Sequence, residues 1–152
     1  MEKKKVKYSE GDLFILETEN HAKFLGLLAR RKGRSKLLFG YFWVLNFDIN
    51  DDLLLNKNKA ITATKFSGLG FELGSWTIIG KYSRWNKNDW PIPEFRRYSE
   101  LIDKYYAISY NEDFEEIAMR NISEEEAKLL FKDGSHGYIS LENYLQKHFS
   151  EK

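Results

Sequence analysis

Two apolar, aromatic-rich runs separated by a short basic spacer constrain the fold most. The first covers residues 21–30 (HAKFLGLLAR) and the second residues 36–47 (KLLFGYFWVLNF). Both are short for helices, and each contains a glycine, Gly26 or Gly40, which is typical of a bulge or a close backbone approach in a strand. The spacer RKGRS has Gly33 at its centre, as hairpin loops often do. The sequence therefore predicts an antiparallel hairpin.

Further strands are expected at residues 14–16, 60–66 and 76–82. The middle segment, AITATKF, alternates as a half-buried strand does. Three glycines between residues 68 and 74 permit turns and bulges. Residues 95–110 fit either a helix face or a strand; we expect a loop or turn through Ser99 and then a strand over about 105–110.

The last third of the chain predicts helices. Ser123 and Glu126 form a capping box, and Gly134 is positioned to end that helix. Its apolar face would be made by Ala127, Leu130 and Phe131. A second helix is expected after Ser140. Its apolar positions recur at helical spacing: Leu141, Tyr144, Leu145 and His148.

Strands followed by helices predict an α+β domain, with a mainly antiparallel, curled or barrel-like β-sheet and C-terminal helices. We expect one domain over residues 1–152, in which residues 1–10 form a flexible or edge segment. We also expect Trp76, which opens an apolar strand, to be buried and Trp85 to be more exposed than Trp76.

The charge is balanced overall but unevenly distributed. A net charge of +1 argues against a strong, diffuse attraction to nucleic acid or anionic membranes. Residues 1–40 hold ten Lys and Arg against five Asp and Glu, whereas residues 112–126 hold seven acids against Arg120 alone. This pattern fits either a molecule with a basic and an acidic face or two ordinary solvated faces.

The absence of cysteine excludes disulfides and thiolate metal sites. There is no apolar run typical of a signal peptide or a membrane span, so we expect a cytoplasmic protein without membrane association.

The chain offers few candidates for catalysis. His21, His136 and His148 do not have metal-ligand spacing, and there is no GxSxG motif. The glycines at 68–74 lack the Lys-Ser/Thr ending of a phosphate loop. We therefore expect no enzymatic activity, no cofactor and no metal.

The segment after residue 80 is aromatic, basic and stiffened by Pro91 and Pro93. Aromatic rings interleaved with cations can hold a nucleic-acid single strand, which makes a small nucleic-acid-binding domain using the loop 81–97 the alternative function. The same residue types dominate protein-binding surfaces, and a purely structural role also fits. The candidate contacts here are Arg84, Trp85, Trp90, Arg96 and Arg97.

Four short motifs occur in order along the chain: Gly-Asp-Leu-Phe at 11–14, Asn-Phe-Asp at 46–48, Gly-Ser-Trp-Thr-Ile-Ile-Gly at 74–80 and Trp-Pro-Ile-Pro-Glu-Phe at 90–95. Together they resemble the immunity protein 26 family of bacterial polymorphic toxin systems. The resemblance extends over roughly residues 11–149. It implies a cytoplasmic immunity protein that binds and neutralises a cognate toxin, without implying which toxin or which oligomeric state.

The acidic segment suits such a role, because carboxylates could cover the basic cleft of a nuclease toxin and speed its capture. The candidate contacts in this segment are Glu115, Glu116, Glu124 and Glu125.

Overall fold

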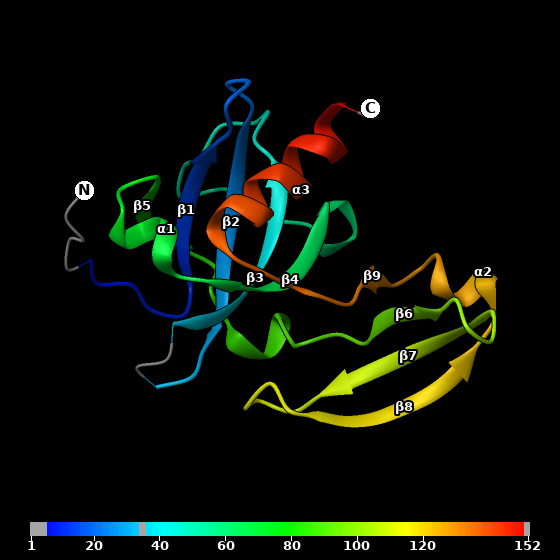
Figure 1. The fold of residues 1–152 in the computed structure, drawn as a ribbon. Coiled ribbons are helices and arrows are strands. Elements are labelled where there is room, and N and C mark those ends of the chain that lie inside the picture. Colours follow the sequence, from blue (N-terminus) through cyan, green and yellow to red (C-terminus); the bar gives the residue numbers. More distant parts are fainter. Residues whose placement is uncertain (1–5, 34–35, 151–152) are drawn as a thin grey trace.

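The computed structural model describes residues 6–33 and 36–150. Ten strands form two sheets, and the helices are short except the last (Figure 1). Sheet A has the order β10 (Ser135–His136), β4 (Thr62–Ser67), β3 (Leu37–Val44), β2 (Lys23–Arg31), β1 (Asp12–Glu17) and β5 (Trp76–Lys81). Sheet B has the order β8 (Glu116–Ile122), β7 (Lys104–Tyr110), β6 (Phe95–Ser99) and β9 (Phe131–Lys132). The helices are α1 (Leu69–Glu72), α2 (Glu124–Ala127) and α3 (Tyr138–Ser150), with 3-10 turns η1 (Lys57–Lys59) and η2 (Lys87–Asp89).

The α+β class is confirmed, and pairing within the sheets is mainly antiparallel. The sheets remain open and do not close into a barrel. No helix in the described ranges is long and apolar enough to cross a membrane.

The predicted hairpin forms the centre of sheet A. β2 and β3 pair antiparallel from Phe24 opposite Val44 onward, with a register shift between Leu28 and Arg30. Residues 34 and 35 of the spacer lie outside the described residues. Gly26 lies under the ring of Phe14 on β1, where a Cβ atom would come within 2.3 Å of the ring. The glycine therefore permits the close packing that the sequence suggested.

Sheet A is buried on both faces. Figure 1 shows α3 lying across one face, where the indole N–H of Trp76 donates to Glu142 at 2.8 Å. The core on this face includes Phe14, Phe24, Phe42, Phe66, Phe71, Trp76, Leu141 and Leu145. The other face is covered by the long connections before β4 and after β5, and its core includes Leu25, Phe39, Tyr41, Trp43, Tyr82, Trp90 and Phe95. The alternation in the sequence predicted that β4 would be buried on one face only. This prediction is wrong, because Thr62, Ala63 and Thr64 are all buried.

Sheet B is attached to sheet A at one end only. The ring of Phe95 on β6 meets Phe39 of β3 edge-on at 6.1 Å. β9 pairs parallel with β6, and two residues later β10 pairs parallel with β4, so the chain passes directly from one sheet to the other. In Figure 1 the rest of sheet B extends away from sheet A, with α2 at its far end. This arrangement leaves most of sheet B open to solvent.

Several elements differ from the prediction. The loop expected through Ser99 is strand β6, and the acidic segment contains an unpredicted strand, β8. The capping hydrogen bond from the Glu126 amide to Ser123 Oγ is confirmed, at 3.0 Å. The helix it begins nevertheless ends at Ala127 after one turn, and Phe131 joins β9.

The C-terminal helix is close to expectation, whereas the described part of the N-terminal segment differs from it. α3 begins at Tyr138, slightly before the predicted start, and buries Leu141 and Leu145. Residues 1–5 lie outside the described residues. Tyr8 is buried against Phe71, with ring centroids 4.9 Å apart, so this part of the N-terminal segment packs on the core rather than lying free.

Candidate partner-binding surface

Exposed apolar side chains gather on sheet B and its loops. Six of the ten large hydrophobic residues that are exposed in the described chain belong to this part of the molecule, although sheet A contributes most of the core. They are Tyr98, Leu101, Ile102, Ile117, Met119 and Leu129. Such a concentration is typical of a surface that contacts a partner.

β8 is the open edge of sheet B. It pairs only with β7, and six of its seven residues are exposed. Ile117, its second residue, and Met119, at its centre, are 62% and 56% exposed. An edge strand of this length presents unpaired backbone N–H and C=O groups that can pair with another chain.

Carboxylates lie at both ends of this edge. Glu115 and Glu116 stand at its start, and Glu124 and Glu125 follow its end in α2. Glu115 and Glu124 are exposed and form no ion pair with any described residue. Glu116 contacts Arg97 at 3.1 Å, and Glu125 lies 3.8 Å from an exposed Lys128. The structure thus places all four predicted acids around one strand.

Two of the three arginines on the strands of sheet B, Arg97 and Arg120, are already matched by carboxylates. Arg120 contacts Glu94 at 2.8 Å and Glu126 at 2.6 Å. Its hydrogen bond holds the pKa of the Glu94 carboxyl below the usual value. Arg97 is bound by Asp133 at 2.7 Å as well as by Glu116, and these hydrogen bonds raise the pKa of its guanidinium. Neither Arg97 nor Arg120 is therefore free to balance the charge of Glu115 and Glu124 at the edge.

The charge imbalance follows the division into sheets. Residues 94–133, which contain sheet B and α2, hold eleven Asp and Glu against six Lys and Arg, a net charge of −5. The rest of the sequence then carries +6, since the whole chain is +1. This distribution favours the two-faced molecule over the alternative of two ordinary solvated faces.

The aromatic and basic loop is largely part of the core. Trp90 is 4% exposed, and Tyr82 and Phe95 are buried with it. Trp85 is half-buried over Gly11, where a side chain would collide with the indole. The expectations for Trp76, which is 3% exposed, and for the greater exposure of Trp85 are confirmed. Burial of Trp90 does not suit direct contact with a partner.

The basic candidates do not form one site. Arg84 is exposed in the connection after β5, whereas Arg96 and Arg97 lie on β6 of sheet B. Arg96 donates from Nη1 to the carbonyl of Leu130 in the segment before β9. Arg97 is held in the ion-pair network described above. Of the basic candidates, Arg84 is thus the most accessible.

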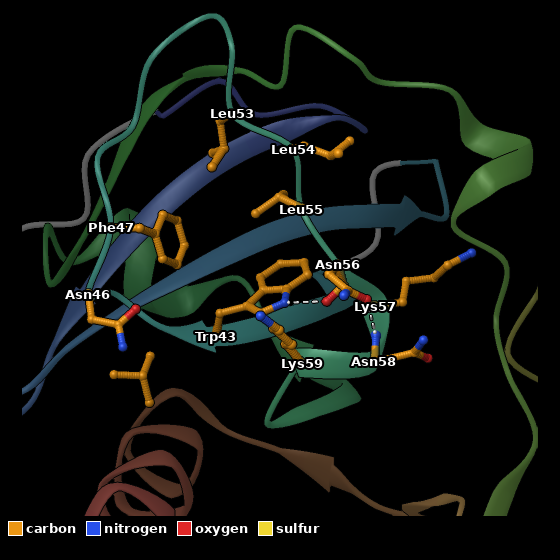
Figure 2. Close-up of a pocket in the computed structure, with 11 residues that line it drawn as sticks. Trp43, Asn46, Phe47, Leu53, Leu54, Leu55, Asn56, Lys57, Asn58 and Lys59 are labelled. Atoms are coloured by element: carbon orange, nitrogen blue, oxygen red, sulfur yellow. Dashed lines mark hydrogen bonds between the residues drawn. The ribbon is translucent and has the colours of Figure 1, made fainter.

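A groove opens on sheet A near Trp43. Its volume is about 960 Å³, and it lies between the end of β3 and the connection that follows (Figure 2). The indole N–H of Trp43 donates to the carbonyl of Asn56 at 2.9 Å within it. The lining consists of Trp43, Val44, Asn46, Phe47, Leu53, Leu54, Leu55, Asn56, Lys57, Asn58 and Lys59. No carboxylate or imidazole is among these lining residues.

His136 has the most suggestive chemical neighbour among the histidines. Its Nδ1 lies 2.8 Å from Ser140 Oγ at the start of α3. The ring also packs on Tyr144, with centroids 5.1 Å apart. No described carboxylate is hydrogen-bonded to the ring to orient it as a base, so the pair lacks the third member of a nucleophilic triad. Among the described residues, no three His, Asp or Glu side chains are grouped so as to hold a metal ion.

Comparison of the chain with models of protein families, with curated proteins and with solved structures gave no match.

Proposed function

We propose that this protein is a non-enzymatic immunity protein that binds and neutralises a cognate polymorphic toxin in the cytoplasm. The observation that carries the proposal is the surface of sheet B, where an open strand with exposed apolar side chains lies between two groups of carboxylates. The motif resemblance described above suggests that the partner is a toxin. Exposed apolar residues supply contact area, and acidic residues favour a partner with a basic surface.

Nucleic-acid binding by the loop 81–97 is less well supported. A stacking platform needs exposed rings. Tyr82, Trp90 and Phe95 are buried in the core of sheet A, and Arg97 is matched by two carboxylates. The most exposed sheet in the molecule is also its acidic part, which repels phosphate groups.

The proposal is tested by expressing a candidate toxin domain taken from a neighbouring reading frame, with and without this chain. We expect growth arrest with the toxin domain alone and restored growth when the chain is co-expressed. The purified pair should elute as a stable complex. An unrelated toxin domain serves as the specificity control, and it should remain toxic. Continued arrest in the presence of soluble, folded chain would contradict the proposal.

A further inference from the structure

We propose that β8 accepts an extended segment of a basic partner as a fifth strand of sheet B. The segment would carry an apolar centre with Lys or Arg at both ends. This inference deepens the proposed function and rests on it only in that the partner is a protein. It assigns the way in which the partner is held.

The backbone of β8 is available for such pairing. Alternate residues of an antiparallel strand direct both the N–H and the C=O group toward the same neighbour. Because β8 pairs with β7 on one side only, the alternate groups on its other side have no strand partner in the described fold. Seven residues present an edge of about 23 Å, enough for a strand of ordinary length.

Side chains on β8 suit an apolar central segment in the added strand. Met119 lies opposite Ile108, which is fully buried, so the exposed Met119 continues an apolar row that begins inside the sheet. Ile117 is also exposed, beside the register shift near Tyr110. Cross-strand apolar pairs of this kind stabilise a sheet, and a partner strand would extend the row by one member.

The charge pattern selects the occupant. Glu115 at the start of β8 and Glu124 just after its end are exposed and form no ion pair with any described residue. If two copies of the chain paired through β8, antiparallel pairing would place the start of one strand at the end of the other. Parallel pairing would place like ends together. Acid would face acid in both cases, and like charges across a pair are destabilising. A second copy is therefore disfavoured, and a strand with basic ends is complementary.

The test uses a synthetic peptide, Lys-Lys-Thr-Val-Ile-Val-Thr-Lys-Lys, and the full chain labelled for NMR. We expect binding in calorimetry and amide shifts concentrated on β8 and β7. The same sequence with Glu in place of Lys should bind at least about tenfold more weakly, since two favourable charge pairs become repulsive. N-methylation of the alternate peptide amides that point toward β8 should abolish binding, because it removes their hydrogen bonds to the strand. N-methylation of the amides that point away from β8 should leave binding intact.

Charge reversal of the protein completes the test. Glu115→Lys with Glu124→Lys should exchange the preference, so that the Glu-ended peptide binds better. The matched control is Glu19→Lys with Asp52→Lys, which makes the same change in net charge at two exposed residues outside sheet B. It should retain the wild-type preference.

Four results would overturn the inference: no peptide binding, equal binding of both peptides, insensitivity to N-methylation in either register, or amide shifts confined to the groove near Trp43. A concentration-dependent dimer in which β8 is protected would also overturn it, because the occupant of the edge would then be a second copy of the chain. Failure of the peptide test together with successful toxin neutralisation would reject only the strand addition. Peptide binding without neutralisation would reject only the proposed function.

Discussion

His136 is the residue whose environment makes the clearest prediction about pH. It is the last residue of β10, just before α3, and burial lowers its pKa below the usual value of 6.5, with a smaller contribution from the positive charge of Lys132. The unfolded chain therefore binds the proton more readily than the folded one. The stabilisation from neutral His136 is complete above about pH 6.5 and is lost as the pH falls through the lower, folded-state pKa.

We expect the free energy of unfolding to fall more steeply below pH 6.5 in the wild type than in His136→Gln, as measured by urea unfolding at several pH values. NMR titration should place the His136 pKa below 6.5, and Lys132→Gln should raise it because a neighbouring positive charge is removed. An identical pH dependence in wild type and His136→Gln would show that the ring is not linked to folding.

Single residues were predicted well where burial follows from a local pattern. Trp76 opens a β-branched strand and is buried, and Trp85 stands between polar residues and is half-exposed. Trp90 is different. It follows Asp89 and precedes two prolines, a context typical of an exposed loop, yet its ring packs against Tyr41 and Trp43. Its burial depends on β3, which is distant in sequence, so no local pattern indicates it.

At the scale of elements, Asp133 joins three strands of sheet B. Its carboxylate accepts hydrogen bonds from Arg97 on β6 at 2.7 Å and from Tyr110 on β7 at 2.6 Å, and it directly follows β9. Burial, followed by the hydrogen bond to Asp133, raises the pKa of Tyr110 to about 12. The group therefore fixes the end of sheet B that is attached to sheet A.

Asp133→Asn should lower the free energy of unfolding by about 1–2 kcal/mol in urea unfolding, because a charged acceptor is lost while Arg97 remains partly solvated. Asp103→Asn is the matched control. Asp103 also accepts from a tyrosine hydroxyl, that of Tyr98, but at an exposed turn. The control should change stability by less than about 0.5 kcal/mol. Equal losses in the two variants would argue against a stabilising role for the Asp133 group.

Elements with a buried face were predictable, and elements stabilised by their neighbours were not. The runs that became β2 and β3 are apolar along their length. β8 is exposed at nearly every position, so it has no alternation of buried and exposed residues to indicate a strand. α2 has the predicted N-terminal capping hydrogen bond to Ser123. It is nevertheless short, because Phe131 pairs with Phe95 as part of β9 and the chain must leave the helix before that point.

At the scale of the whole molecule, the sequence located the acids but not their arrangement. Their enrichment in residues 112–126 is evident from the sequence. That they lie at both ends of an open strand depends on the pairing of β8 with β7, which the sequence did not indicate. The separation of the basic candidates also depends on the arrangement of the sheets: Arg84 and Arg97 are close in sequence, but Arg84 follows β5 of sheet A and Arg97 lies on β6 of sheet B.

The division of charge supports the proposal that sheet B is the surface that captures a basic toxin. Only Glu115 and Glu124 should be changed to test this proposal, because Glu116 forms an ion pair with Arg97 inside the molecule. Reversing these two charges should leave the stability of the chain nearly unchanged, since both side chains are exposed and form no ion pair with any described residue.

The most direct measurement is the affinity of the proposed toxin partner for the wild type and for Glu115→Lys with Glu124→Lys, at low and at physiological salt. We predict that the double change weakens binding by at least about tenfold and reduces its dependence on salt. Glu19→Lys with Asp52→Lys should bind as the wild type does. Equal affinity of the wild type and the sheet B variant at both salt concentrations would contradict the claim.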